Sequence, residues 1–130
     1  MSLVLVHDGL ANTAALFIAG LGIWALIQRL RSRPLDSGWF GAAVIGEVLI
    51  IAQGLLGGLL YLQGYGAALP RPFMHILYGA VAVVTLPAAY GYFGALEDEN
   101  VKSLALAFVC LFLWGIIMRA TTVATYPAPV

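Results

Sequence analysis

The sequence predicts an all-α integral membrane protein, a bundle of four transmembrane helices. Three observations support this fold class. Of the 130 residues, 62% are hydrophobic and only 9% are charged, whereas a soluble domain usually carries about 25% charged residues. Four apolar stretches are each long enough to cross a bilayer, which takes roughly 20 residues. A backbone in lipid must satisfy its own hydrogen bonds, so each stretch is expected to be a helix.

The four expected helices follow one another in a single transmembrane domain over residues 1–130. We place them at about residues 4–30, 39–62, 73–93 and 101–123. Glycines and prolines mark the loop before the third helix as turn-rich. Pro87 is expected to kink the third helix near its end. A short tail with Pro127 and Pro129 follows the fourth helix.

Basic residues in the loops predict the orientation. The first loop contains three arginines and the third contains Lys102, whereas Arg71 and Arg119 lie on the other side. Because loops rich in basic residues stay in the cytoplasm, we expect the first and third loops there and both termini outside. The expected location is the cell membrane, as a multi-pass protein.

The charge balance and the cysteine content exclude some classes of partner and framework. Six basic and six acidic residues give no net charge and no basic patch, so we expect no nucleic-acid partner. The lipid bilayer is the expected surrounding, and a second copy or a larger membrane complex is a candidate partner. Cys110 is the only cysteine, which excludes an internal disulfide and predicts a small buried apolar side chain.

The chain contains only two histidines, His7 and His75. Each lies within about one turn of the start of the first or the third expected helix. Because both helices enter from the outer side, and each residue adds roughly 1.5 Å of rise, the two imidazoles are expected to face each other at one depth. Two lone histidines do not make a zinc site. They suit an iron whose four equatorial ligands come from a porphyrin, so both are candidate metal ligands.

Small residues surround the expected level of the histidines. Ala11 and Gly79 each follow a histidine by four residues, and Gly57 and Gly58 in the second helix reach a similar depth. Since residues four apart share a helix face, these positions would leave clearance for a flat macrocycle. The alternative is that they only allow helices to pack closely.

Two arginines are candidate partners for the propionates of a heme. Arg71 precedes His75, and Arg119 lies near the outer end of the fourth helix. Guanidinium groups pair well with carboxylates, although an arginine at a membrane surface also snorkels to lipid phosphate. Met118 is a conceivable axial ligand, but a methionine in a membrane helix is usually a packing residue.

Glu47 is a separate functional candidate, because an ionisable group inside a bilayer is costly. Gln53 and Thr85 are its candidate hydrogen-bond partners, and a proton or quinone site is its candidate role. It lies far from the histidine level.

These motifs resemble a known family. The stretch from Gln53 to Tyr61 contains Gln-x-x-Leu-Gly-Gly, and a short outer loop separates it from a helix that opens with His75. This pattern resembles one four-helix half of the heme A synthase family, in which the preceding helix also opens with a histidine, here His7. The resemblance covers roughly residues 4–84. It implies that His7 and His75 are axial ligands of a b-type heme.

The sequence departs from that family in two respects. The family's first histidine lies in Glu-x-x-His-Arg, whereas Val4 and Asp8 occupy the flanking positions here. Family members also contain two fused bundles, and this chain has one. The missing glutamate argues against a complete heme A synthase.

The leading interpretation is a membrane protein with a bis-histidine heme b near the outer leaflet, serving electron transfer or heme handling. The alternative is a small structural or accessory subunit of a respiratory or photosynthetic complex. In that case Trp24, Trp39 and Trp114 would pack against partners or bind pigment, and each histidine would hydrogen-bond or bind a chlorin magnesium. A carrier or channel with Glu47 and Gln53 as its polar core ranks third.

Overall fold

The computed structural model describes residues 2–125 of the chain, so the tail with Pro127 and Pro129 lies outside the described residues. The described part contains helices and no strand. Its elements are α1 (Leu3–Leu30), α2 (Ser37–Leu62), the 3₁₀ helix η1 (Tyr65–Ala68), α3 (Pro72–Phe93) and α4 (Glu99–Thr125). All four α-helices are long and apolar enough to cross a membrane. The predicted four-helix bundle is therefore present.

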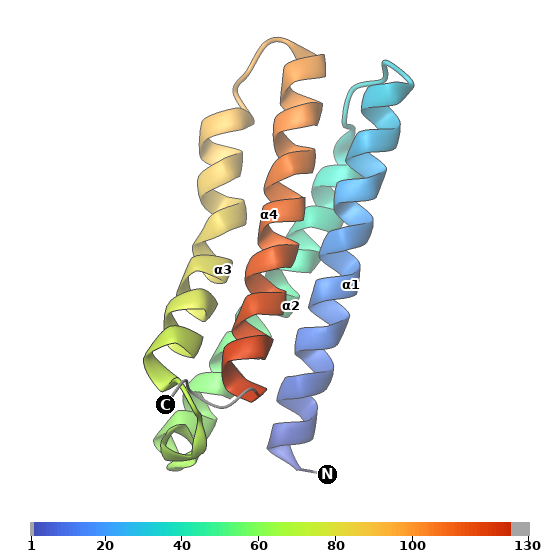
Figure 1. Cartoon of the computed structure of the whole chain (residues 1–130). Helices are drawn as coiled ribbons and strands as arrows, with labels where there is room; N and C mark the ends of the chain where they lie inside the picture. The colour runs from blue at the N-terminus through green and yellow to red at the C-terminus, as the bar shows by residue number, and fades with distance from the viewer. Residues whose placement is uncertain (1, 126–130) are drawn as a thin grey trace.

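The helices run alternately up and down (Figure 1). The start of α1, the end of α2, η1, the start of α3 and the end of α4 lie at one end of the bundle. This end contains both histidines, and we call it the histidine end. Helix α4 packs against both α1 and α3, whereas α2 packs mainly against α1 and less closely against α3.

Polar residues and a glycine define the helix ends. The side chains of Ser2 and Asp36 accept hydrogen bonds from the first turns of α1 and α2, and Asp98 Oδ1 accepts from the backbone N–H groups at the start of α4. Such caps satisfy N–H groups that have no helical acceptor. Gly64 follows the end of α2 with φ +92°, a left-handed conformation that glycine adopts without strain.

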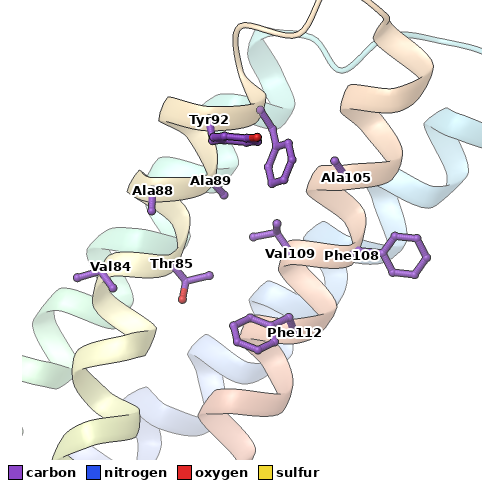
Figure 2. Close-up of a pocket in the computed structure, with 10 residues that line it drawn as sticks. Val84, Thr85, Ala88, Ala89, Tyr92, Ala105, Phe108, Val109 and Phe112 are labelled. Carbon is purple, nitrogen blue, oxygen red and sulfur yellow. The ribbon is translucent and has the colours of Figure 1, made fainter.

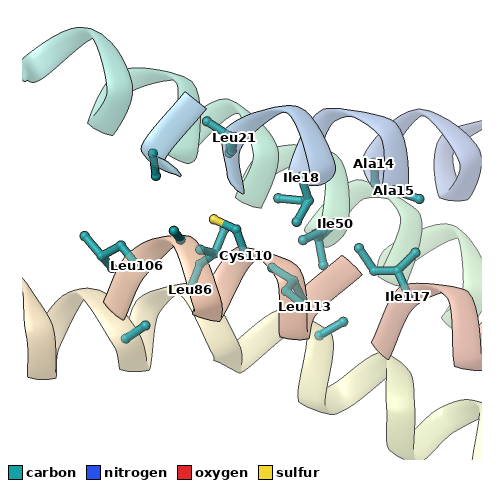
Figure 3. Close-up of a cluster of buried hydrophobic side chains, with 14 of the residues drawn as sticks. Ala14, Ala15, Ile18, Leu21, Ile50, Leu86, Leu106, Cys110, Leu113 and Ile117 are labelled. Carbon is teal, nitrogen blue, oxygen red and sulfur yellow. The ribbon is translucent and has the colours of Figure 1, made fainter. Parts of the chain in front are cut away.

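All four helices contribute to the core, and α1 and α4 contribute most of its buried residues (Figure 3). Ile18 and Leu21 of α1 lie near Cys110 and Leu113 of α4. The prediction that Cys110 is a buried apolar side chain is confirmed, since it is fully buried with a free thiol. A Cβ atom added at Gly22 would lie 3.2 Å from Cys110 Cβ, so the glycine lets the two helices approach closely.

The structure differs from the sequence-based expectations in a few places. Helix α2 begins at Ser37 and α4 at Glu99, each two residues earlier than expected, because Asp36 and Asp98 act as caps. The loop after α2 contains the unexpected 3₁₀ helix. Trp39 is not available to a partner, since it is only 1% exposed and its indole N–H donates to the Leu21 carbonyl at 3.1 Å.

Candidate functional site

The histidine end brings the two imidazoles together. His7 lies in the second turn of α1, and His75 lies in the first turn of α3. Their ring centroids are 6.1 Å apart, and the ring planes meet at 73°. Both side chains are partly buried. The two residues are 68 positions apart in the sequence (75 − 7), so the up-and-down topology is what makes them neighbours.

Each imidazole is oriented by a backbone carbonyl of a neighbouring helix. His7 Nδ1 lies 3.0 Å from the Gln53 carbonyl oxygen in α2, and His75 Nδ1 lies 2.9 Å from the Ala120 carbonyl oxygen in α4. Because a carbonyl can only accept, Nδ1 is the donor in both rings, and in a neutral ring Nε2 then carries the lone pair. The arrangement therefore presents two Nε2 atoms in the form that binds a metal.

Gln53 contacts His7 from two directions. Its carbonyl accepts from Nδ1, and its side-chain amide nitrogen lies 3.4 Å from His7 Nε2, where it is placed to donate to the lone pair. Sequence reasoning missed this role and considered Gln53 as a partner for Glu47. The available signal was spacing, because Gln53 and Gly57 are four residues apart and share the α2 face that meets His7.

The four small residues differ in their surroundings. A Cβ added at Gly57 would lie 2.9 Å from His7 Cε1, so this glycine makes room for the imidazole itself. A Cβ at Gly58 or at Gly79 would meet nothing within 4 Å. Ala11 lies one turn further along α1 from His7 and is partly buried. Gly58, Gly79 and Ala11 are thus the positions near this level that add little bulk.

The two arginines also lie at the histidine end. Arg71 immediately precedes α3, and its carbonyl accepts from the His75 backbone N–H at 3.1 Å. Arg119 is exposed and adjoins Ala120, whose backbone carbonyl accepts a hydrogen bond from His75 Nδ1. Within residues 2–125 the one ion pair is Lys102–Glu99, at the opposite end, so both guanidinium groups are without a carboxylate partner there. Both are available to an anionic group.

Met118 is poorly placed to be a ligand. Its side chain is exposed. The atom of α4 that His75 Nδ1 contacts is the Ala120 backbone carbonyl oxygen, and not Met118.

Glu47 belongs to a second place in the bundle. It precedes Gly57 by ten residues, which corresponds to about 15 Å along α2. Neither carboxyl oxygen has a hydrogen-bond partner among the described residues. The expected bonds to Gln53 and Thr85 are not made, because Gln53 contacts His7 and the Thr85 hydroxyl donates to the Val81 carbonyl. Glu47 instead lines a cavity between α2 and α3.

A larger cavity of about 620 Å³ lies between α3 and α4 (Figure 2). Val84 and Ala88 of α3 and Phe108 and Phe112 of α4 are among the apolar residues that line it. Its lining is mostly apolar and contains no histidine, cysteine or carboxylate; its polar groups are the hydroxyls of Thr85 and Tyr92.

The described residues contain no group of three or more histidine, cysteine, aspartate or glutamate side chains that could hold a metal ion. Among these residues, the histidine end brings two imidazoles together. No protein-family model matches this chain, and no curated protein or solved structure is detectably similar to it.

Proposed function

We propose that this chain is an integral membrane protein of the cell membrane that binds one heme b, with His7 and His75 as the two axial ligands. The observation that carries the proposal is the orientation of both imidazoles by backbone carbonyls. Metal-binding histidines almost always donate their other ring N–H to such an acceptor, which sets the tautomer and the ring position.

The ring spacing supports one metal ion between the two histidines. A metal–nitrogen bond is about 2 Å long. Two such bonds, together with the distance from each nitrogen to its ring centre, give a centroid separation close to the 6.1 Å in the structure. The two imidazole rings are thus at a spacing that suits one metal ion between them. The Gln53 amide would have to leave His7 Nε2 when a metal binds there.

A porphyrin supplies the ligands that the protein lacks. Zinc usually takes four protein ligands, or three and a water, and the described residues offer two in one place. Gly79 and Ala11 add little bulk near the level of the rings, and Arg71 and Arg119 would pair with the propionates. With both axial positions filled by protein, the iron suits electron transfer or heme handling better than oxygen chemistry.

The resemblance to the heme A synthase family enters this proposal at the level of the heme site only. Val4 and Asp8 stand where that family has a glutamate and an arginine. We therefore propose a b-type heme site within this four-helix bundle and do not extend the proposal to the heme A synthase reaction. Both termini would lie outside, which places the heme near the outer leaflet.

Absorption spectra of the detergent-purified protein test this function. We expect a low-spin b-type spectrum after dithionite reduction, with one heme per chain by pyridine hemochrome assay. His7→Ala and His75→Ala should each abolish it. Asp8→Ala is the matched control, since Asp8 adjoins His7 but is exposed, and it should leave the spectrum unchanged. A colourless protein, or a spectrum that survives both histidine variants while helicity is retained, would overturn the proposal.

A further inference from the structure

The cavity that contains Glu47 has a composition unlike the rest of the bundle interior. It has a volume of about 380 Å³ and lies between α2 and α3, with Leu106 of α4 at its wall. Figure 1 shows α2 and α3 close together at the histidine end and apart at the other end. The cavity lies in this wider part, on the interface that packs least closely.

Three aromatic rings pack in sequence at this cavity, and the first of them, Trp39, is itself almost fully covered. Trp39 and Phe40 of α2 are edge to face, with centroids 5.2 Å apart. Phe40 and Tyr90 of α3 are also edge to face, with centroids 5.8 Å apart. These three residues are among the cavity's lining residues. Aromatic side chains favour stacked or edge-to-face contact with another flat ring, so the walls suit a planar apolar occupant.

Glu47 adds the one carboxyl group to walls that are otherwise mostly apolar. Both of its carboxyl oxygens are covered by surrounding atoms and have no partner among residues 2–125. A buried polar group without a partner costs roughly 1–3 kcal/mol. The neighbouring cavity between α3 and α4 is larger and has no carboxylate. A crevice that holds only lipid acyl chains gains nothing from Glu47, which indicates an occupant with a hydrogen-bonding atom.

We propose that the cavity between α2 and α3 binds the head ring of a membrane-soluble quinone or quinol, with Glu47 as its hydrogen-bonding residue. A protonated carboxyl donates to a quinone carbonyl, and a carboxylate accepts from a quinol hydroxyl. One residue therefore serves both forms of the occupant. Because both carboxyl oxygens are covered in the structure, binding would require the Glu47 side chain to rotate toward the ring. This site is separate from the heme site and shares with it only the premise that the helices lie in a bilayer.

Photolabelling of the full chain tests this site. The probe is an azido-benzoquinone with a short alkyl tail, added to the protein in detergent, with unlabelled decyl-benzoquinone as competitor. Mass spectrometry then identifies the labelled peptides. We expect labelling within residues 39–47 and 86–90 that the competitor reduces. We do not expect labelling that falls only in the α3–α4 cavity.

Two variants and one control measure the contribution of the cavity. Glu47→Leu should raise the half-maximal competitor concentration at least tenfold, because the hydrogen bond is lost while the volume is nearly kept. Gly41→Leu should do the same by occupying space, since Gly41 lines the cavity and a Cβ there meets nothing within 4 Å. Gly20→Leu makes the same change at an open position on α1 and should match the unmodified chain.

The outcomes separate this inference from the heme proposal. Heme content is measured on the same samples, so quinone labelling without heme supports this site and overturns only the other. If the cavity only holds acyl chains, the half-maximal competitor concentration of Glu47→Leu would be within twofold of that of the unmodified chain. That result would overturn the quinone site. Labelling that the competitor does not reduce, or that falls only in the α3–α4 cavity, also overturns it.

Discussion

At the scale of single residues, the missing side chain of Gly57 is part of the histidine site. A Cβ at this position would lie 2.9 Å from His7 Cε1, which is too close for the ring to stay where it is. We expect Gly57→Ala to displace the imidazole and break its bond to the Gln53 carbonyl. The loss of one hydrogen bond, about 1.4 kcal/mol, weakens heme binding roughly tenfold. Heme titration of the detergent-purified variant measures this change.

The adjacent glycine is a matched control for that prediction. A Cβ at Gly58 meets nothing within 4 Å, so Gly58→Ala should bind heme like the unmodified chain. Equal heme affinity for Gly57→Ala and Gly58→Ala would show that the close contact at Gly57 does not position His7.

The sequence predicted the meeting of His7 and His75, because both occupy early turns of helices that start at one end of the bundle. It did not predict what holds the rings. The acceptors are the backbone carbonyls of Gln53 and Ala120, and every residue has such a carbonyl. Which one faces an imidazole depends on the rotation of each helix about its axis, and that rotation is set by packing over the whole bundle.

At the scale of elements, the contact between α1 and α4 depends on Gly22. A Cβ there would lie 3.2 Å from Cys110 Cβ and 3.6 Å from the Ala107 carbonyl oxygen. We expect Gly22→Leu to force the two helices apart and to lower stability by about 1–3 kcal/mol, the usual cost of overpacking. Thermal unfolding in detergent, followed by circular dichroism, measures the loss.

Gly20→Leu is the control for this element. It lies two residues away on the exposed side of α1, where an added Cβ meets nothing within 4 Å. It should keep or raise the melting temperature, because leucine is a better helix former than glycine by up to about 1 kcal/mol. If Gly22→Leu and Gly20→Leu had the same melting temperature, the close approach of α1 and α4 would not depend on Gly22.

The approximate helix bounds were predictable, because length and hydropathy mark each apolar stretch. The buried face of each helix was not predictable, because both faces of these helices are apolar. Ile18 is fully buried and Leu16 is 75% exposed, yet the two side chains have the same hydropathic character. For the same reason the sequence did not reveal that α4 packs against both α1 and α3, or that α2 and α3 enclose a cavity.

At the scale of the whole molecule, the orientation in the membrane decides which compartment the histidine end faces. The distribution of basic loop residues predicts that this end lies outside. We expect Ser2→Cys to react with a membrane-impermeant maleimide on intact spheroplasts, and Ser37→Cys to react only after permeabilisation. Both positions are exposed, and they lie at opposite ends of the bundle. Both variants are made in a Cys110→Ala background.

The background chain should stay unlabelled, which excludes signal from other groups. Labelling of Ser37→Cys but not Ser2→Cys on intact spheroplasts would place the histidine end in the cytoplasm. The heme ligands would be the same in that case, but Arg71 and Arg119 would face the cytoplasm. A redox partner of the heme would then have to be sought there, since the iron would lie near that surface.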